Sequence, residues 1–128
     1  MKSKTLFTVT ALIEVLTGIG LILAPALLVR ILLGSEISTE TEFTICRVGG
    51  SAIIALGITC WLARNDDKSG AAKALTFGML IYNTMVFATL AYSGMVSKTT
   101  IALVAALIVH LVLGVACLLS LKSFKRIS

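Results

Sequence analysis

The sequence predicts an all-α integral membrane protein, a four-helix bundle whose helices run up, down, up and down. Its composition and four long apolar runs predict this fold. Hydrophobic residues make up 58% of the 128 residues and charged residues only 13%, and the mean hydropathy is +1.04. A soluble domain typically carries about 25% charged residues to cover its surface. This composition therefore suits a chain whose surroundings are lipid.

Four apolar segments are long enough to cross a bilayer, because a helix needs about 20 mainly apolar residues to span the hydrocarbon layer. They are predicted at residues 5–24, 44–63, 71–92 and 99–121. The connections between them are short, so consecutive helices should be antiparallel neighbours. Residues 1–128 are accordingly predicted to form a single transmembrane domain.

The first span is predicted to end at Pro25, because proline supplies no backbone donor and clashes with the preceding turn. Residues 26–33 are predicted to continue as a short helix at the membrane interface. A cleaved signal peptide is the competing interpretation of this segment. Glu14 in the middle of the apolar run and Pro25 inside the cleavage-like motif both argue for a membrane span instead.

Capping residues predict where the later helices begin. Thr39 and Glu42 have the spacing of a capping box, so the second helix should start just after Thr39. Asp67 or Ser69 is predicted to cap the third helix, and Ser97 the fourth.

The basic residues predict the orientation, since eight of eleven fall on one side of a four-span topology and three on the other. The larger group contains Lys2, Lys4, Arg64, Lys68, Lys73, Lys122, Lys125 and Arg126, and the smaller contains Arg30, Arg47 and Lys98. Basic residues accumulate on the cytoplasmic side of membrane proteins, so both termini are predicted to be cytoplasmic. The net charge of +5 then reflects orientation. It does not indicate a nucleic-acid partner, because the basic residues are not interleaved with stacking aromatics.

Three polar side chains lie at a similar depth inside the apolar runs. At about 1.5 Å per residue from the predicted cytoplasmic ends, Glu14 lies roughly 14 Å deep, Asn83 roughly 18 Å and His110 roughly 17 Å. A charged side chain at the centre of a membrane helix costs about 2.5 to 3.5 kcal/mol, so Glu14 must face protein or water. Such residues often mark ligand or ion sites, although a buried pair can instead serve only to fix helix register.

We therefore predict a ligand-binding or proton-carrying site from Glu14, Arg47, His110, Asn83 and Tyr82. Arg47 lies nearer the outer end of its span, but its long stem could bring the guanidinium toward Glu14. A functional role is favoured for Glu14 and Arg47, and a structural role for Asn83 and Tyr82. For His110 the two interpretations carry equal weight.

The sequence predicts no metal site, no cofactor and no catalytic residue. The single histidine has no accompanying cluster of cysteines. The three cysteines, Cys46, Cys60 and Cys117, include no C-x-x-C pair that would indicate thiol-disulfide exchange. A binding role is thus favoured over an enzymatic one.

Several short stretches occur here in a combination found in one group of membrane proteins. They are Glu14 with Thr17-Gly18, Pro25, Arg47 to Ala52 followed by Gly57, Cys60 to Arg64, Tyr82-Asn83 and the lone His110. Over nearly its whole length the chain thereby resembles the small bacterial four-span proteins of the DoxX-like group. The resemblance implies a location in the bacterial inner (plasma) membrane. DoxX is associated with quinone-linked redox complexes, so the resemblance also implies an accessory or lipophile-binding role.

A second, shorter resemblance involves the first span alone. The run from Ala11 to Val15 is similar to the first helix of small multidrug-resistance exporters, which also carry a glutamate within the membrane. Those exporters have no match to the stretch from Arg47 to Ala52.

Three functions follow as predictions. The leading one is a non-enzymatic membrane protein that binds a small lipophilic or anionic ligand within its bundle, or serves as an accessory subunit. Its expected partners are membrane lipid and either a second copy or a larger membrane assembly. The alternative is a small proton-coupled transporter that uses Glu14, with His110 as a proton partner. The weaker alternative is an enzyme acting on a quinone or lipid.

Overall fold

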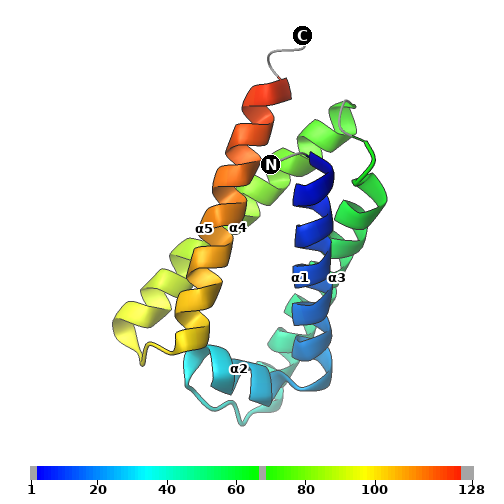
Figure 1. Ribbon diagram of the computed structural model, residues 1–128. Helices are drawn as coiled ribbons and strands as arrows, with labels where there is room; N and C mark the ends of the chain where they lie inside the picture. Colours follow the sequence, from blue (N-terminus) through cyan, green and yellow to red (C-terminus); the bar gives the residue numbers. More distant parts are fainter. Residues whose placement is uncertain (1–2, 67–68, 125–128) are drawn as a thin grey trace.

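The computed structural model describes residues 3–66 and 69–124 and contains five helices in that part of the chain (Figure 1). They are α1 (Ser3–Leu23), α2 (Pro25–Leu33), α3 (Glu40–Ala63), α4 (Gly70–Val96) and α5 (Ile101–Phe124). All except α2 are long and apolar enough to cross a membrane. The predicted all-helical membrane bundle is confirmed, and each span was predicted to within four residues at either end.

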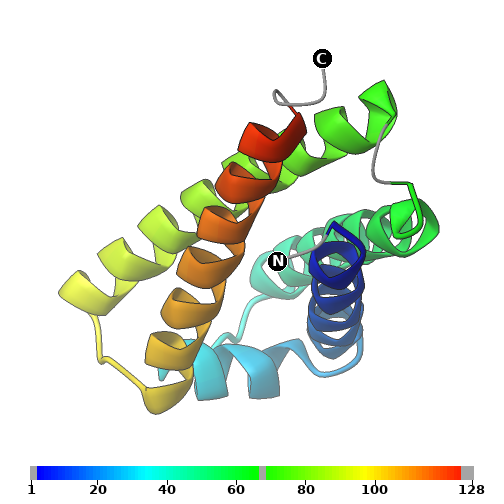
Figure 2. The ribbon, with the colours of Figure 1, turned by 45° about the horizontal axis from the view of Figure 1, so that its top comes forward.

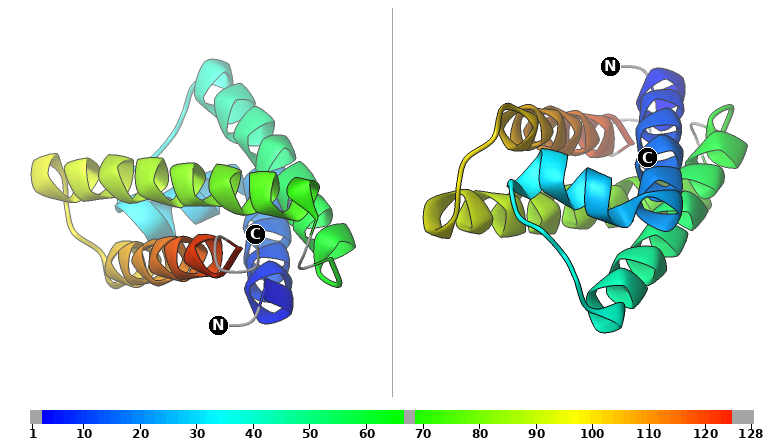
Figure 3. Two further views of the ribbon diagram at one scale, coloured as in Figure 1. Left: turned by 90° about the horizontal axis from the view of Figure 1, so that it is seen from above. Right: turned by 90° about the horizontal axis from the view of Figure 1, so that it is seen from below.

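The long helices form two antiparallel pairs. α1 packs along α3, and α4 packs along α5. The pairs approach each other at the end that holds the N-terminus and diverge toward the opposite end (Figure 1). There α2 bridges the gap and contacts α1, α3 and α5 (Figure 2). Not all consecutive spans are close neighbours, because α4 crosses α3 at a wide angle when seen along the bundle (Figure 3).

The tightest side-chain core lies at the end where the pairs meet. Leu6 and Phe7 of α1, Cys60 of α3, Met79 of α4 and Cys117 of α5 are all fully buried in one cluster. Because every long helix contributes to this cluster, apolar packing joins the pairs here. The other end depends on α2 to connect them.

The short helix α2 was predicted, and its two ends have clear causes. Pro25 occupies its first turn, where a missing N–H has no consequence. Gly34 ends it in the left-handed conformation, with φ of 65°. The Thr100 hydroxyl donates to the carbonyl of Leu32 at 2.7 Å and thereby ties α2 to the start of α5.

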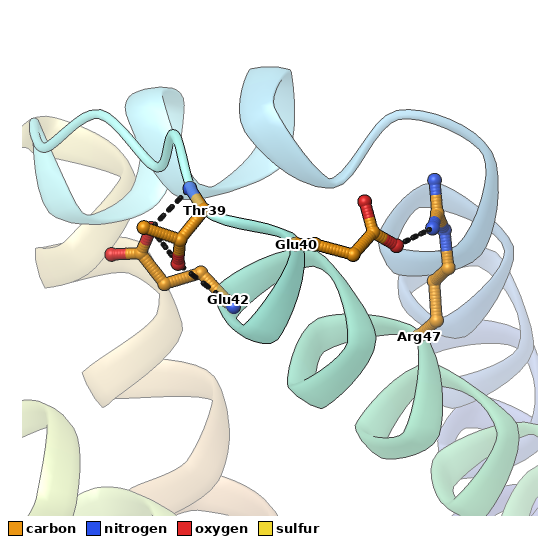
Figure 4. A network of polar contacts seen from close by, with 4 residues as sticks. All are labelled: Thr39, Glu40, Glu42 and Arg47. Atoms are coloured by element: carbon orange, nitrogen blue, oxygen red, sulfur yellow. Dashed lines mark hydrogen bonds and ion pairs between the residues drawn. The ribbon is translucent and has the colours of Figure 1, made fainter.

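The predicted capping box of α3 is confirmed (Figure 4). The N–H of Glu42 donates to the Thr39 hydroxyl at 3.3 Å, and the N–H of Thr39 donates to the Glu42 carboxylate at 2.8 Å. Ser69 caps α4 by accepting from the N–H of Ala72 at 3.1 Å. The other predicted cap of this helix, Asp67, lies outside the described residues.

The predicted cap at Ser97 is wrong. Ser97 instead follows the last turn of α4, and its N–H donates to the carbonyl of Ser93. α5 begins later, at Ile101, where the Thr100 hydroxyl accepts from the N–H of Leu103 at 3.0 Å. α4 extends to Val96 and so includes residues that the apolar pattern assigns to the connection between the third and fourth spans.

Glycines allow the backbones of α1 and α3 to touch. A Cβ atom added to Gly50 would lie 2.8 Å from the carbonyl oxygen of Gly18, and one added to Gly57 would lie 3.0 Å from that of Ala11. Small residues commonly permit such close approach between membrane helices. Gly49, the neighbour of Gly50, faces open space with nothing within 4 Å.

We predict that Gly50→Ala destabilises the protein and that Gly49→Ala does not. The methyl group at position 50 would force the two backbones apart, at a cost of about 1 to 3 kcal/mol. The methyl group at position 49 meets no atom and favours the helix slightly. Unfolding by SDS in mixed detergent micelles, followed by circular dichroism, measures both. Equal stability of the two variants would contradict the close contact.

Candidate functional site

A cavity of about 340 Å³ lies between the two helix pairs, next to α2. Three of the five predicted site residues line it: Glu14, Tyr82 and His110. The remaining lining is apolar apart from Thr17 and consists of Ile13, Leu28, Ile31, Leu32, Val86, Leu90, Ala102, Ala105, Ala106 and Val109. Four helices thus contribute to one largely hydrophobic site with a few polar groups, which is the usual composition of a small-molecule pocket.

Glu14 is the most deeply buried polar group of the cavity, with 1% of its surface exposed. It is the twelfth of the 21 residues of α1, near the middle of the membrane span. Its Oε2 accepts a hydrogen bond from the Tyr82 hydroxyl at 2.8 Å. Its Oε1 is buried and has no partner among the described residues. Thr10, one turn away, also has an unpaired buried oxygen, but it does not line the cavity.

The Tyr82 hydroxyl connects the two helix pairs, because α4 supplies the tyrosine and α1 the carboxylate. The Tyr82 ring also meets the His110 ring edge-on, with 5.9 Å between centroids and 75° between planes. Packing was the favoured interpretation of Tyr82 from sequence. The structure makes it the direct partner of Glu14, in addition to any packing role.

Asn83 and His110 form a second polar contact, between α4 and α5. Asn83 is fully buried, and its Nδ2 donates to the carbonyl of Met79 at 2.8 Å. Its Oδ1 lies 2.9 Å from His110 Nδ1. Since the Met79 carbonyl can only accept, the amide nitrogen must face it, and Oδ1 must accept from an Nδ1–H. In a neutral imidazole this leaves Nε2 as an acceptor.

Glu14, Tyr82 and His110 line the cavity, and Asn83 contacts His110. Arg47 is the predicted site residue that lies apart from this group. Its side chain is half exposed and lies 3.5 Å from the Glu40 carboxylate (Figure 4). It also lies over the Phe43 ring, 5.8 Å from the centroid. The last turn of α1 is level with Gly50, whose added Cβ would meet Leu21 at 3.0 Å. Arg47 is one turn further out, so it extends beyond the end of α1 and does not reach Glu14.

The sequence interpretation missed the contribution of α2 to the site. Leu28, Ile31 and Leu32 line the cavity from this helix. Their spacing of three and four residues places them on one helix face, and this periodicity was a signal in the sequence. The sequence predicts a short helix at the membrane interface, but it does not show that the helix pairs diverge and that this helix lines the space between them.

Metal binding by the usual ligands has no support in this part of the chain. Within residues 3–66 and 69–124, no three His, Cys, Asp or Glu side chains are placed to share a metal ion. The polar groups of the cavity are suited to hydrogen bonding.

We predict that Asn83 and His110 stabilise the protein as a pair. Asn83→Leu keeps a similar side-chain volume but leaves the part-buried Nδ1–H of His110 without its acceptor, at a cost of about 1 to 3 kcal/mol. The double variant Asn83→Leu with His110→Leu should then lose less free energy of unfolding than the two single variants summed, because the pair acts as a unit. Arg47→Met serves as the control, and as the loss of an exposed ion pair it should cost less than about 1 kcal/mol. Simple additivity in SDS unfolding would refute the pairing.

In comparisons with known proteins, no protein-family model, curated protein or solved structure matches the chain. The resemblance to the DoxX-like group therefore stays a prediction, and the interpretation of the cavity depends on its geometry.

Proposed function

We propose that this multi-pass membrane protein binds a small lipophilic molecule in the cavity between its helix pairs. The observation that carries the proposal is the buried, unpaired Oε1 of Glu14, a residue that lines a largely apolar cavity. An unpaired buried polar atom is costly and is rare in native proteins, so it calls for a partner such as a ligand or water. The volume, about 340 Å³, falls in the range of small-molecule sites.

The surroundings of the cavity favour a ligand that arrives from the bilayer. Ile31 and Ala105 line the cavity and are also exposed on the surface of the bundle. This exposed part of the lining gives a lipophile a route from the hydrocarbon layer into the cavity that does not pass through water.

An anionic ligand, the other class predicted from sequence, fits this geometry less well. Glu14 would repel an anion when ionised. Arg47, the cation expected to attract it, pairs with Glu40 outside the cavity.

Proton-coupled transport is the second candidate function, and the Glu14–Tyr82 hydrogen bond favours it. The unpaired Oε1 could hold a proton, and His110 lies beside Tyr82. Accumulation of a substrate driven by a proton gradient in vesicles would distinguish transport from binding. No observation favours the quinone- or lipid-linked enzyme.

Residence in a bacterial inner membrane with both termini cytoplasmic is part of the proposal. The four apolar helices support the membrane location and the distribution of basic residues supports the orientation, whereas the bacterial inner membrane follows from the family resemblance. Membrane lipid is the expected partner of the exposed apolar faces. An accessory role in a larger assembly, or pairing with a second copy, follows from the predicted family resemblance alone.

We predict that a photoreactive alkane labels the cavity of the protein in lipid nanodiscs. Diazirine-dodecane should label peptides that carry cavity-lining residues, as mapped by mass spectrometry. Ala106→Phe should reduce this labelling several-fold, because the ring would fill space between α1 and α5. Ala88→Phe is the matched control, since Ala88 is an exposed residue of α4 outside the cavity. The proposed function fails if labelling follows only the exposed helix faces and Ala106→Phe leaves it unchanged.

We predict from the basic residues that the connections after α2 and α4 face the periplasm. Single cysteines at Glu36 and Lys98, in a variant whose own cysteines are replaced by serine, should react with an impermeant maleimide applied to intact cells. A cysteine at Asn65 should react only after the membrane is opened. The reverse labelling pattern would show that the orientation is inverted.

A further inference from the structure

The polar groups of the cavity present hydrogen-bond acceptors. The hydroxyl hydrogen of Tyr82 is donated to Glu14 Oε2, so the Tyr82 oxygen has only lone pairs left to offer. His110 donates from Nδ1 to Asn83, and the neutral ring therefore keeps Nε2 as an acceptor. Thr17 can act in either sense. A ligand that matches this lining must supply a donor.

The lining also argues against a charged ligand. Apart from the titratable ring of His110, Glu14 is the one acidic or basic side chain of the lining. No lysine or arginine is therefore present there to pair with an anion. A charged group at the centre of a membrane helix costs about 2.5 to 3.5 kcal/mol. Phospholipid head groups and other ions would incur a cost of this kind at the depth of Glu14.

The protonation of Glu14 restricts the neutral choices further. A carbonyl can pair with Oε1 only when the carboxyl group is protonated, and an ammonium group only when it is ionised. A hydroxyl pairs in both states, because it donates to a carboxylate and accepts from a carboxylic acid. It is therefore the smallest single group that satisfies Oε1 in both states, and it can also donate to an acceptor nitrogen or oxygen nearby.

We infer that the ligand is an uncharged lipophile with a hydroxyl group, an alcohol or a phenol, whose hydroxyl pairs with Oε1 of Glu14. The inference rests on the proposed function and adds the chemistry of the polar group. The apolar part of the ligand lies against Leu28 and Leu32 of α2 and Val109 of α5, which line the same cavity.

Competition against the diazirine-dodecane label tests this pairing. Dodecanol, methyl dodecyl ether, dodecylamine and dodecane are compared in the same nanodiscs at equal membrane mole fraction. Dodecanol should reduce cavity labelling several-fold more than each of the other three. Glu36→Gln, a change at an exposed residue outside the cavity, should leave this order unaltered.

Glu14→Gln provides the decisive variant, because it keeps the shape of the side chain. Its amide oxygen can still accept from Tyr82, and its NH₂ group then replaces Oε1 as a donor toward the cavity. The advantage of dodecanol over the ether should vanish, since the ether oxygen accepts equally well, while the alkane label still enters. Circular dichroism and SDS unfolding establish that the variant is folded.

The outcomes separate the inference from the proposed function. If all four compounds compete equally, or if Glu14→Gln leaves the advantage of dodecanol intact, the hydroxyl pairing is wrong but lipophile binding stands. If dodecylamine competes best, the ligand is a cation and the hydroxyl class is overturned. If the alkane label never reaches the cavity, the proposed function itself fails.

Discussion

A polar group inside the hydrocarbon layer must find its partner within the protein, and in this chain the partner of Glu14 comes from the other helix pair. The Tyr82 hydroxyl reaches across the space between the pairs to Glu14 at 2.8 Å. Lipid offers no substitute for that contact, because it cannot donate a hydrogen bond at this depth. The bond thus fixes the relative height of α1 and α4. It also limits the separation of the two helix pairs at this level.

The cavity arises because the helix pairs diverge, and the close backbone contact of α1 with α3 is not repeated between the pairs (Figure 1). Gly18, Gly50 and Gly57 bring the backbones of α1 and α3 into contact. Between the pairs, the buried core at the N-terminal end holds the helices together, and α2 separates them at the opposite end (Figure 1). Pro25 and Gly34 stop α2 from extending in either direction. A short helix of that length closes the gap, and its apolar face becomes one wall of the cavity.

The sequence predicted what depends on local chemistry and on the membrane. Hydropathy identified the four spans, the capping box at Thr39 and Glu42 was recognised from its spacing, and the helical rise placed Glu14, Asn83 and His110 at one level. The sequence could not show how far one helix extends beyond another. Arg47 misses Glu14 because α1 ends level with Gly50, a fact of relative helix offset. The place of α2 in the cavity depends in the same way on the divergence of the pairs.

The two oxygens of Glu14 bear on whether a buried carboxyl group in a membrane bundle is structural or functional. Oε2 is engaged by Tyr82 and holds two helix pairs together, while Oε1 is buried without a partner in the described part of the chain. If stability alone had determined this residue, an uncharged hydroxyl side chain would leave fewer unmatched atoms and cost less to desolvate. A carboxyl group with one oxygen bonded is held in a fixed position, and under the proposed function its second oxygen is thereby oriented in advance for a ligand or a proton. For the proposed binding role the structural bond is therefore an advantage, because a freely rotating side chain would lose part of its binding energy to ordering.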